Sequence, residues 1–264
     1  MRRRATLPHA RAPLPIHPSS SRRQEDRPTE TELDYGRFEA LTFDCYGTLI
    51  DWEAGILAGL RPVLAARGVT KPTDDELLEK FAHSESALES GPYLRYREIL
   101  GRCLREVAAD YAVAPDLADV AAFADSVGNW PAFPDSVDAL RRLHERFRLG
   151  VITNCDDDLF ARSAARLRTD FDWVVTAQRA RGYKPNPHNF EVALVRIGLP
   201  RDKILHVAQS LFHDHVPAKK MGFATVWIDR RAGRPGSGAT PPAKAKPDAT
   251  FPDMVSFAEA ATAG

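Results

Sequence analysis

The sequence of 264 residues is poor in cysteine, lacks long apolar runs and carries no net charge. Its three cysteines, Cys45, Cys103 and Cys155, include no Cys-x-x-Cys pair, which argues against a disulfide framework and a zinc site. No apolar run approaches the roughly 18 residues that a membrane-spanning helix needs. These absences predict a cytoplasmic protein in a reducing compartment, with no membrane partner.

The zero net charge is the sum of two unequal parts. Residues 1–24 contain six arginines and no acidic residue, whereas the remaining residues hold 30 basic against 36 acidic side chains, a net charge of −6. Nucleic acid binding relies on Lys and Arg contacts to phosphates, so an acidic body is a poor surface for it. The charge distribution therefore argues against a nucleic acid partner.

The first 35 residues differ in composition from the rest of the chain. They hold five prolines, three consecutive serines and the arginine cluster, without apolar periodicity, and this predicts a disordered basic tail over 1–35. An Arg-rich, acid-poor start leaves a transit peptide open as the alternative. The proline spacing argues against the amphipathic helix that such a peptide forms.

Short apolar runs alternate with helical patterns in the body of the chain. The runs suit buried parallel strands because they are apolar on both faces. Expected helices include 135–147, 187–197 with Asn186 as N-cap and Gly198 as its end, and a last helix over 253–262. The alternation predicts an α/β fold with an open parallel sheet, whose ligands bind at the carboxyl ends of the strands. The expected strands cover 38–44, 149–153, 173–176, 204–207 and 224–228.

Roughly 100 residues separate the first two expected strands, far more than a simple crossover needs. A capping-box pattern over 73–76 opens one helix, and 94–112 and 116–126 predict two more. This excess predicts an inserted helical cap over the carboxyl end of the first strand, where a lid belongs. The expected organisation is a core over 36–55 and 128–264 with a cap over 56–127.

Four expected strand ends carry polar side chains. Asp44 follows the first strand and can act as a nucleophile, although an aspartate that caps the next turn is the alternative. Gly47 permits a tight turn, and Thr48 offers a hydroxyl. Thr153 and Asn154 end the second strand with hydrogen-bond donors that suit an anion.

The third and fourth strand ends bring a cation and an acid. Lys184 follows the third strand and is expected to pair with Asp44. Asp214 follows the fourth strand, with Ser210 nearby. The neighbours of Asp214 are both histidines, but three consecutive side chains do not share one helix face, so a three-ligand metal site is not expected.

Together these residues resemble the haloacid dehalogenase superfamily of hydrolases over about 39–230. Asp44 matches motif I, Thr153 motif II, Lys184 motif III and Asp214 motif IV. The resemblance implies a Rossmann-like core with a cap. Residues 44–49 look like the Asp-x-Tyr-Gly-Thr-Leu motif of the 2-haloacid dehalogenase branch, whereas phosphatases of the superfamily carry a second aspartate where Tyr46 stands.

The branch implies displacement of halide from a small 2-haloacid, through an ester on Asp44 and without a cofactor. A halide leaves without a proton, so the missing acid at position 46 suits this reaction. Lys184 would orient Asp44, and Asp214 would position Lys184 or the water. The predicted partner is a small anionic substrate, and a homodimer is left open. The residues expected to bind the substrate are Tyr46, Thr48, Thr153, Asn154, Ser210 and Arg97.

Several residues depart from the pattern of the branch. Ala208, Gln209 and Ser210 stand where dehalogenases place Ser and Asn, with a one-residue ambiguity that lets His213 compete with Asp214. Position 190 is Phe rather than Tyr, and residues 81–85 lack the cap arginine that receives the halide. Arg95 or Arg97 is the expected substitute. A Mg²⁺-dependent phosphatase and a non-catalytic binding protein are the alternative functions.

Overall fold

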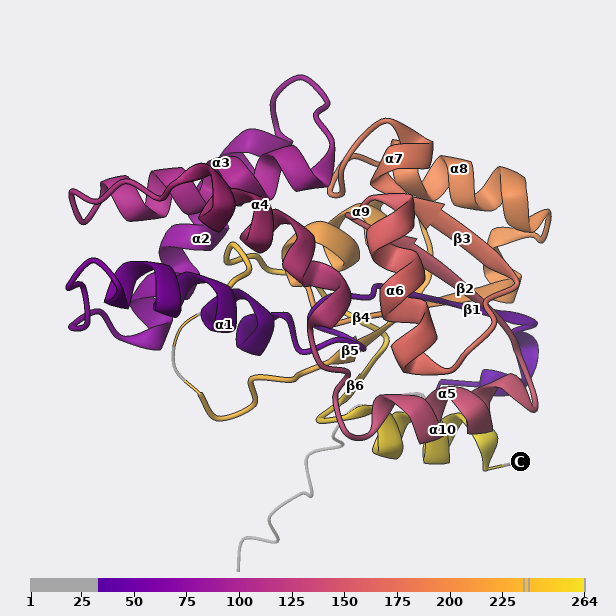
Figure 1. Cartoon of the computed structure of the whole chain (residues 1–264). Helices are drawn as coiled ribbons and strands as arrows, with labels where there is room; N and C mark the ends of the chain where they lie inside the picture. The colour runs from indigo at the N-terminus through magenta and orange to yellow at the C-terminus, as the bar shows by residue number, and fades with distance from the viewer. Residues whose placement is uncertain (1–32, 235, 237, 264) are drawn as a thin grey trace, which may run out of the picture. The chain divides into compact units, whose positions relative to one another are not determined.

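The computed structural model describes residues 33–234, 236 and 238–263 (Figure 1). The predicted tail lies outside these residues except for positions 33–35, so its disorder stays a prediction. Among the described residues, no helix is long and apolar enough to cross a membrane. The body of the chain folds as an α/β protein.

Six parallel strands form one sheet in the order β3-β2-β1-β4-β5-β6. The predicted parallel α/β sheet is therefore confirmed, and β6 is an edge strand that the sequence reading missed. After β3 the chain crosses to the other side of β1, so β1 lies at the point where the strand order reverses, where open sheets bind ligands. The strands are β1 (Ala40–Phe43), β2 (Arg148–Thr153), β3 (Trp173–Thr176), β4 (Ile204–Ala208), β5 (Ala224–Ile228) and β6 (Ala249–Phe251).

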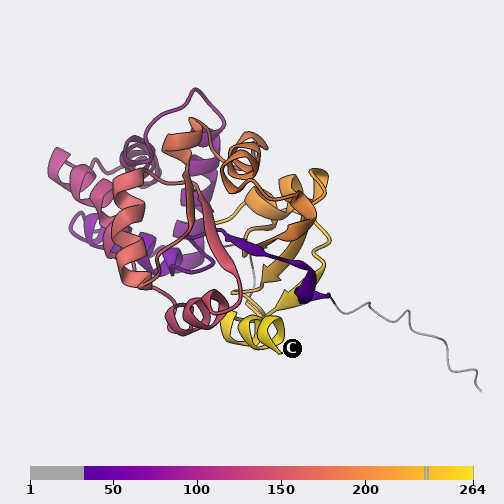
Figure 2. The same ribbon diagram turned by 90° about the vertical axis from the view of Figure 1, so that its right-hand side faces the viewer.

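The strands are apolar on both faces because helices cover both faces (Figure 2). In β1, Leu41 and Phe43 belong to one hydrophobic cluster with residues of α5, α6 and α10, and Ala40 belongs to a second with residues of α8 and α9. Phe43 is in register with Val151 of β2 and Val207 of β4. The core helices are α5 (Ser136–His144), α6 (Asp157–Leu167), α7 (Ala177–Ala180), α8 (His188–Ile197), α9 (Val216–Lys220) and α10 (Met254–Thr262).

The local signals for the ends of helices were mostly right. Thr73 caps α2 in a capping box with Glu76, and Gly198 ends α8 in the left-handed conformation, at φ +70°. The N-cap of α8 is Pro187 rather than the predicted Asn186, whose side chain instead accepts a hydrogen bond from the His188 N–H at 3.0 Å. The short single-turn elements are η1 (Tyr35–Arg37), η2 (Ser126–Asn129), η3 (Arg201–Lys203) and η4 (Leu211–His215), of which η4 is a π-helix.

A helical cap is inserted between β1 and α5, as predicted. Its helices are α1 (Trp52–Ala65), α2 (Asp74–Glu89), α3 (Tyr96–Ala109) and α4 (Leu117–Asp125). The two connections to the core run side by side, because the Asp51 N–H donates to the Pro131 carbonyl at 2.8 Å and the Phe133 N–H donates to the Leu49 carbonyl at 3.0 Å. The cap is therefore tied to the core immediately after the turn that follows β1.

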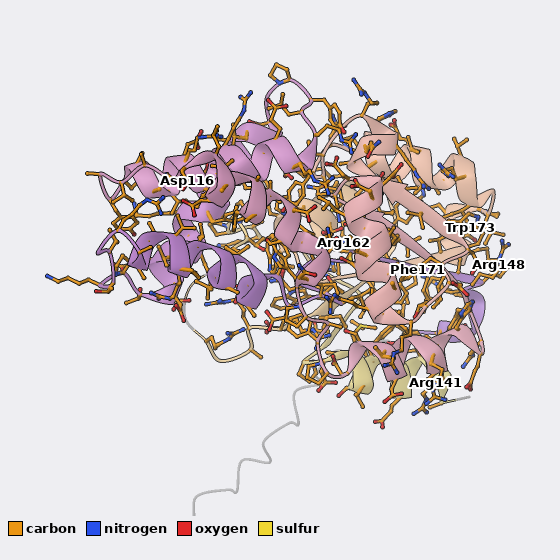
Figure 3. All side chains as sticks on the ribbon, in the orientation of Figure 1. Asp116, Arg141, Arg148, Arg162, Phe171 and Trp173 are labelled. Carbon is orange, nitrogen blue, oxygen red and sulfur yellow. The ribbon has the colours of Figure 1, made fainter. Side chains whose placement is uncertain are left out.

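Arginines of the core hold the cap through side-chain contacts. Arg162 of α6 pairs with Asp125 at the end of α4 at 2.9 Å (Figure 3). Arg231, in the loop after β5, is 9% exposed and pairs with Glu53 of α1 at 2.8 Å and Asp75 of α2 at 2.9 Å. These contacts fix the first two cap helices and the last one against the core, so α2 holds a defined position above the sheet.

Candidate active site

The turn after β1 carries Asp44 to the carboxyl end of the sheet. The Asp44 N–H still donates to the Val207 carbonyl of β4 at 3.1 Å, and the chain then turns sharply at Gly47, whose φ is +94°. A Cβ at position 47 would also lie 2.9 Å from the Trp52 indole nitrogen, so glycine is required both for conformation and for space. The tight turn leaves the Asp44 carboxylate facing the cap.

Both oxygens of Asp44 accept hydrogen bonds. Lys184 Nζ donates to Oδ1 at 2.8 Å, and Thr48 Oγ1 donates to Oδ2 at 2.7 Å. The Thr48 hydroxyl is itself oriented by the Gln209 N–H, which donates to it at 2.9 Å. Burial raises the pKa of Asp44, and Lys184 opposes this. Because both oxygens accept, the site is built for the ionised carboxylate, the form that acts as a nucleophile.

Lys184 is the charge at the centre of the site and is 1% exposed. Its Nζ donates three hydrogen bonds of 2.8 Å, to Asp44, to Asp214 and to the Ile152 carbonyl, which uses all three ammonium protons. Burial alone would lower the pKa of Lys184, but the two carboxylates raise it above its usual value. Lys184 is thus a fixed cation that holds Asp44 in place.

The π-helix η4 carries Asp214 to the other side of Lys184. Burial alone would raise the pKa of Asp214, but Lys184 and His206 lower it well below its usual range, so it is ionised. His206 Nε2 lies 2.9 Å from Asp214 Oδ1 and donates to it, and the Thr42 hydroxyl lies 2.9 Å from Nδ1. Asp214, not His213, contacts Lys184, which resolves the register of the fourth motif.

Asn154 and Thr153 follow β2 but occupy different surroundings. Asn154 clamps the backbone of Lys184, accepting from its N–H at 2.7 Å and donating to its carbonyl at 3.0 Å. The Asn154 amide also donates to Glu89 of α2 at 3.0 Å. Thr153 is buried, and its hydroxyl has no hydrogen-bond partner among the described residues. Asn154 therefore links the core site to the cap, whereas Thr153 is not part of this link.

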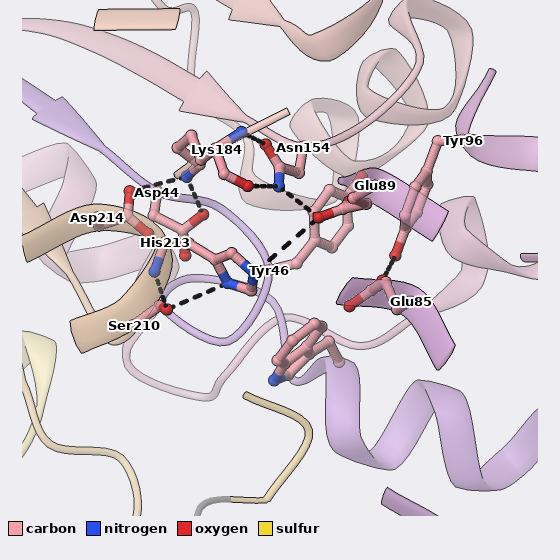
Figure 4. A pocket seen from close by; sticks show the side chains of 11 residues that line it. Asp44, Tyr46, Glu85, Glu89, Tyr96, Asn154, Lys184, Ser210, His213 and Asp214 are labelled. Carbon is pink, nitrogen blue, oxygen red and sulfur yellow. Dashed lines mark hydrogen bonds and ion pairs between the residues drawn. The ribbon is translucent and has the colours of Figure 1, made fainter. Parts of the chain in front are cut away.

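A pocket lies between the cap and these strand ends (Figure 4). Six of the nine predicted site residues line it, Thr48 contacts one of the six, and Thr153 and Arg97 are not part of its wall. The pocket therefore collects the predicted nucleophile and its partners in one small chamber. Its wall consists of Asp44, Tyr46, Trp52, Glu85, Glu89, Tyr96, Asn154, Lys184, Ser210, His213 and Asp214.

Tyr46 presents its ring to the pocket and turns its hydroxyl elsewhere. The hydroxyl forms a 3.0 Å hydrogen bond with Ser163 of α6, and the ring packs edge-on against Trp130 with centroids 5.8 Å apart. Burial raises the pKa of Tyr46 well above its usual value, so the phenol is not a base near neutral pH. The position therefore supplies shape rather than acid or base chemistry.

The structure does not bring the predicted cap arginines into the pocket. Arg97 pairs with Asp125 at 2.6 Å and with Asp158 at 2.5 Å on the outer surface. Arg95 pairs with Asp156 at 3.1 Å. Arg95 is the N-cap of α3 and Arg97 lies in its first turn, and both pair with acidic side chains at the end of α4 and the start of α6. Neither arginine is placed to receive a substrate or a halide.

Three polar side chains of the pocket wall come from the cap and were not predicted from the sequence. Glu85 and Glu89 of α2 and Tyr96 of α3 line the pocket. A signal for the two acids was present, because α2 buries Leu77, Leu78 and Phe81, and positions 85 and 89 continue that face at helical spacing. Acidic side chains on an apolar stripe are exceptional, since buried carboxyl groups need partners.

Comparisons with known proteins identify a family and a fold that match this chain. The profile of the haloacid dehalogenase-like hydrolase family matches residues 38–211, more than half of the chain. Haloacetate dehalogenase H-2 of Moraxella sp. (strain B) is 25% identical over 200 residues, which cover 74% of this chain and 87% of that protein.

Solved structures show the same fold. The structure of an L-2-haloacid dehalogenase matches with a TM-score of 0.72 at 20% identity, covering 86% of this chain and all of the other. The L-2-haloacid dehalogenase of Xanthobacter autotrophicus matches with a TM-score of 0.69 at 18% identity, covering 84% and 97%. The predicted core with an inserted cap is therefore confirmed, and the chain belongs to the haloacid dehalogenase-like hydrolase family.

Proposed function

We propose that this hydrolase displaces halide from a small 2-haloacid through an ester on Asp44. The observation that carries the proposal is the buried Asp44 carboxylate, held by Lys184 and Thr48, beside Tyr46 with its hydroxyl engaged by Ser163. The site thus offers a fixed nucleophile and no second carboxyl group at position 46. The similarity to a haloacetate dehalogenase and to L-2-haloacid dehalogenases supports this choice of reaction.

In the first step, an Asp44 oxygen attacks the carbon that bears the halogen. The new C–O bond forms as the carbon–halogen bond breaks, and the halide leaves with the electron pair. The halide leaves without a proton, so this step does not require a general acid at position 46. Lys184 and Thr48 hold the carboxylate in one orientation, which favours attack from a fixed position.

In the second step, water attacks the ester carbonyl carbon of Asp44. The C–O bond to Asp44 breaks, the product leaves as a 2-hydroxy acid, and the carboxylate is restored with release of one proton. Lys184 lies against Asp44 Oδ1 and stabilises negative charge that develops on the carbonyl oxygen. The Asp214 Oδ2 atom is buried without a partner in the described structure, so it is free to accept a hydrogen bond from the attacking water.

The phosphatase alternative fits the residues poorly. Mg²⁺ demands near-octahedral oxygen ligands. Lys184 Nζ already lies 2.8 Å from one oxygen each of Asp44 and Asp214, and positions 46 and 209 supply Tyr and Gln instead of acids. The described residues also contain no group of three or more His, Cys, Asp or Glu side chains arranged to hold a metal ion. We therefore propose a reaction without a cofactor.

Halide release from a panel of 2-haloacids, with and without a chelator, tests the proposal. Release that survives the chelator is expected, and Asp44→Asn should abolish it while leaving the thermal melt nearly unchanged. Phosphate release that depends on Mg²⁺, without halide release, would instead establish the phosphatase. A protein that only binds ligands gives no signal above the Asp44→Asn background in either assay.

A single turnover in H₂¹⁸O with enzyme in excess tests the ester itself. The product of the first turnover should contain ordinary oxygen, because that oxygen comes from Asp44, and the label should appear on Asp44. Labelled product from the first turnover would show direct attack by water and refute the nucleophilic role.

A further inference from the structure

Among the residues that the structure describes, the cap end of the pocket carries two carboxyl groups and no cation. Glu85 and Glu89 stand four residues apart on the same face of α2 and line the pocket opposite the core. The Glu85 residue is 3% exposed and the Glu89 side chain 4% exposed. Lys184 is the one lysine or arginine in the described wall, and its three protons are spent on Asp44, Asp214 and a carbonyl.

The two acids are only partly satisfied by the protein. Glu85 Oε1 accepts from the Tyr96 hydroxyl at 2.7 Å, and Glu89 Oε2 accepts from Asn154 at 3.0 Å (Figure 4). Glu89 Oε1 is buried with no partner among the described residues. Buried polar atoms are rarely left without a partner, so this oxygen points to a ligand group.

His213 brings a second unpartnered atom to the same place. The Ser210 hydroxyl accepts from the His213 backbone N–H at 2.9 Å and lies 3.2 Å from Nδ1. In the tautomer whose Nδ1 accepts from Ser210, the ring proton is on Nε2, which is buried without a hydrogen-bond partner among the described residues, 4.0 Å from Glu89 Oε2. An N–H donor and a carboxyl oxygen therefore lie side by side, facing the pocket.

A carboxylate anion is a poor match for this end of the pocket. Asp44, Asp214 and Lys184 already sum to a net charge of −1 in a buried site, and ionised Glu85 and Glu89 would add to it. Like charges in a site of low dielectric repel far more strongly than in water. A carboxamide has the same shape as a carboxylate but carries no charge, and it both donates and accepts hydrogen bonds.

We propose that Glu85 and Glu89 exclude carboxylate anions from the cap end and select a neutral, hydrogen-bonding head group, so that 2-haloamides are preferred to 2-haloacid anions above neutral pH. This inference rests on the displacement chemistry proposed above and narrows its substrates. A 2-haloacid anion is accepted less well as the glutamate pair loses its protons.

The electrostatics of the facing groups agree with this assignment. Burial raises the pKa of Glu85 to about 7 and raises that of Glu89 well above its usual value, an effect that Lys184 and Asn154 oppose in Glu89. Burial lowers the pKa of His213 to about 4, so this ring adds no positive charge near neutral pH. Repulsion of an anion should therefore grow as the pH rises through about 7.

The test compares 2-chloropropionamide with 2-chloropropionate, which differ in charge and little in size. The readout is the ratio of kcat/KM for the amide to that for the acid, at pH 5.5 and pH 8.5. For the wild-type protein we expect this ratio to rise at least tenfold between the two values. The wild-type pH series requires no variant to fold.

Glu85→Gln combined with Glu89→Gln should remove most of that rise and increase kcat/KM for the acid at pH 8.5 at least tenfold. Comparing ratios cancels the intrinsic difference in reactivity between the two compounds. Glu79→Gln, an exposed change on the same helix, is the matched control and should leave the ratio as in the wild type. Glu85→Gln alone serves if the double variant does not fold.

The outcomes separate this inference from the proposed function. A ratio that is independent of pH and unchanged in the variants would overturn the inference and leave dehalogenation standing. Failure to release chloride from either compound at any pH would overturn both.

Discussion

Replacing Glu85 with glutamine should stabilise the protein at alkaline pH. Glu85 is almost wholly buried, and the Tyr96 hydroxyl is its hydrogen-bond donor. Burial raises its pKa to about 7 from an ordinary value of 4.5. Such a difference between the folded and unfolded states corresponds to ~3 kcal/mol of pH-dependent stability.

The sign follows from which state holds the proton. The folded protein keeps a proton on Glu85 that the unfolded chain releases above pH 4.5. The contribution of Glu85 to the free energy of unfolding is therefore fully present below pH 4.5 and is lost as the pH rises to about 7. The glutamine side chain of the variant does not titrate. The free energy of unfolding of the wild type, relative to that of Glu85→Gln, should therefore fall by ~3 kcal/mol between pH 4.5 and pH 8.

Urea unfolding at pH 4.5, 6 and 8 measures this difference. Acids that do not interact with Glu85 titrate equally in both proteins, so subtracting the two curves leaves the titration of Glu85 together with its effect on the neighbouring Glu89. Glu79→Gln, which changes an exposed acid on the same helix, should track the wild type at every pH. Parallel curves for the wild type and Glu85→Gln would show that Glu85 ionises normally and would remove the electrostatic basis for an anion-excluding cap.

Three further changes probe the core, the surface and the cap. Lys184→Met leaves two buried carboxylates without their shared cation and should cost ~3–5 kcal/mol by urea unfolding, beyond the loss of activity. Arg97→Ala removes ion pairs at the surface and should change stability by less than ~1 kcal/mol; an altered KM would contradict the placement of Arg97 outside the pocket. Gly55→Ala places a Cβ 2.2 Å from the buried Trp130 ring, and the overpacking should lower stability by ~1–3 kcal/mol by thermal melting.

The core was predictable because its information is local. Each central strand is a short run of apolar residues buried on both faces, and a polar residue such as Asp44 or Asn154 marks the point where the strand ends. Parallel strands bring their carboxyl ends to one edge, so residues more than 100 positions apart could be placed together from sequence. The contact of Lys184 with Asp44 follows from that geometry.

The edge strand β6 was not predicted, because its local sequence carries little indication of a strand. β6 has three residues, Ala249–Phe251, none of them fully buried, after a stretch rich in proline and glycine. Its backbone position is set by pairing with β5, where Val226 is in register with Ala249. Edge strands bury one face at most, so their sequences carry a weaker apolar pattern than central strands. The opposite edge is held differently, with Arg148 stacked on the Trp173 ring of β3 at 4.0 Å (Figure 3).

The cap was predicted as a helical insertion, but its inward side chains were not. Which face of α2 meets the pocket depends on the packing of four helices, and on how Arg231 pins α1 and α2 to the core. Arg97 was predicted to bind the substrate because of its positive charge, but in the structure it pairs with acidic side chains at the surface. The periodic apolar residues of α2 give a better prediction of the pocket wall, because they mark the buried face of the helix on which Glu85 and Glu89 also lie.

The core side and the cap side of the pocket therefore have different roles in the proposed reaction. Asp44, Lys184 and Asp214 lie at the carboxyl edge of the sheet, Asp44 directly after β1, Lys184 after α7 and Asp214 in η4, and in the proposed reaction they act where the bond is made and broken. The groups that meet the rest of the substrate come from a helix that packs onto the core from outside, so they can change without disturbing the nucleophile. Under the proposed function the core residues displace the halide, and under the further proposal Glu85 and Glu89 in the cap wall disfavour an anionic head group as the pH rises.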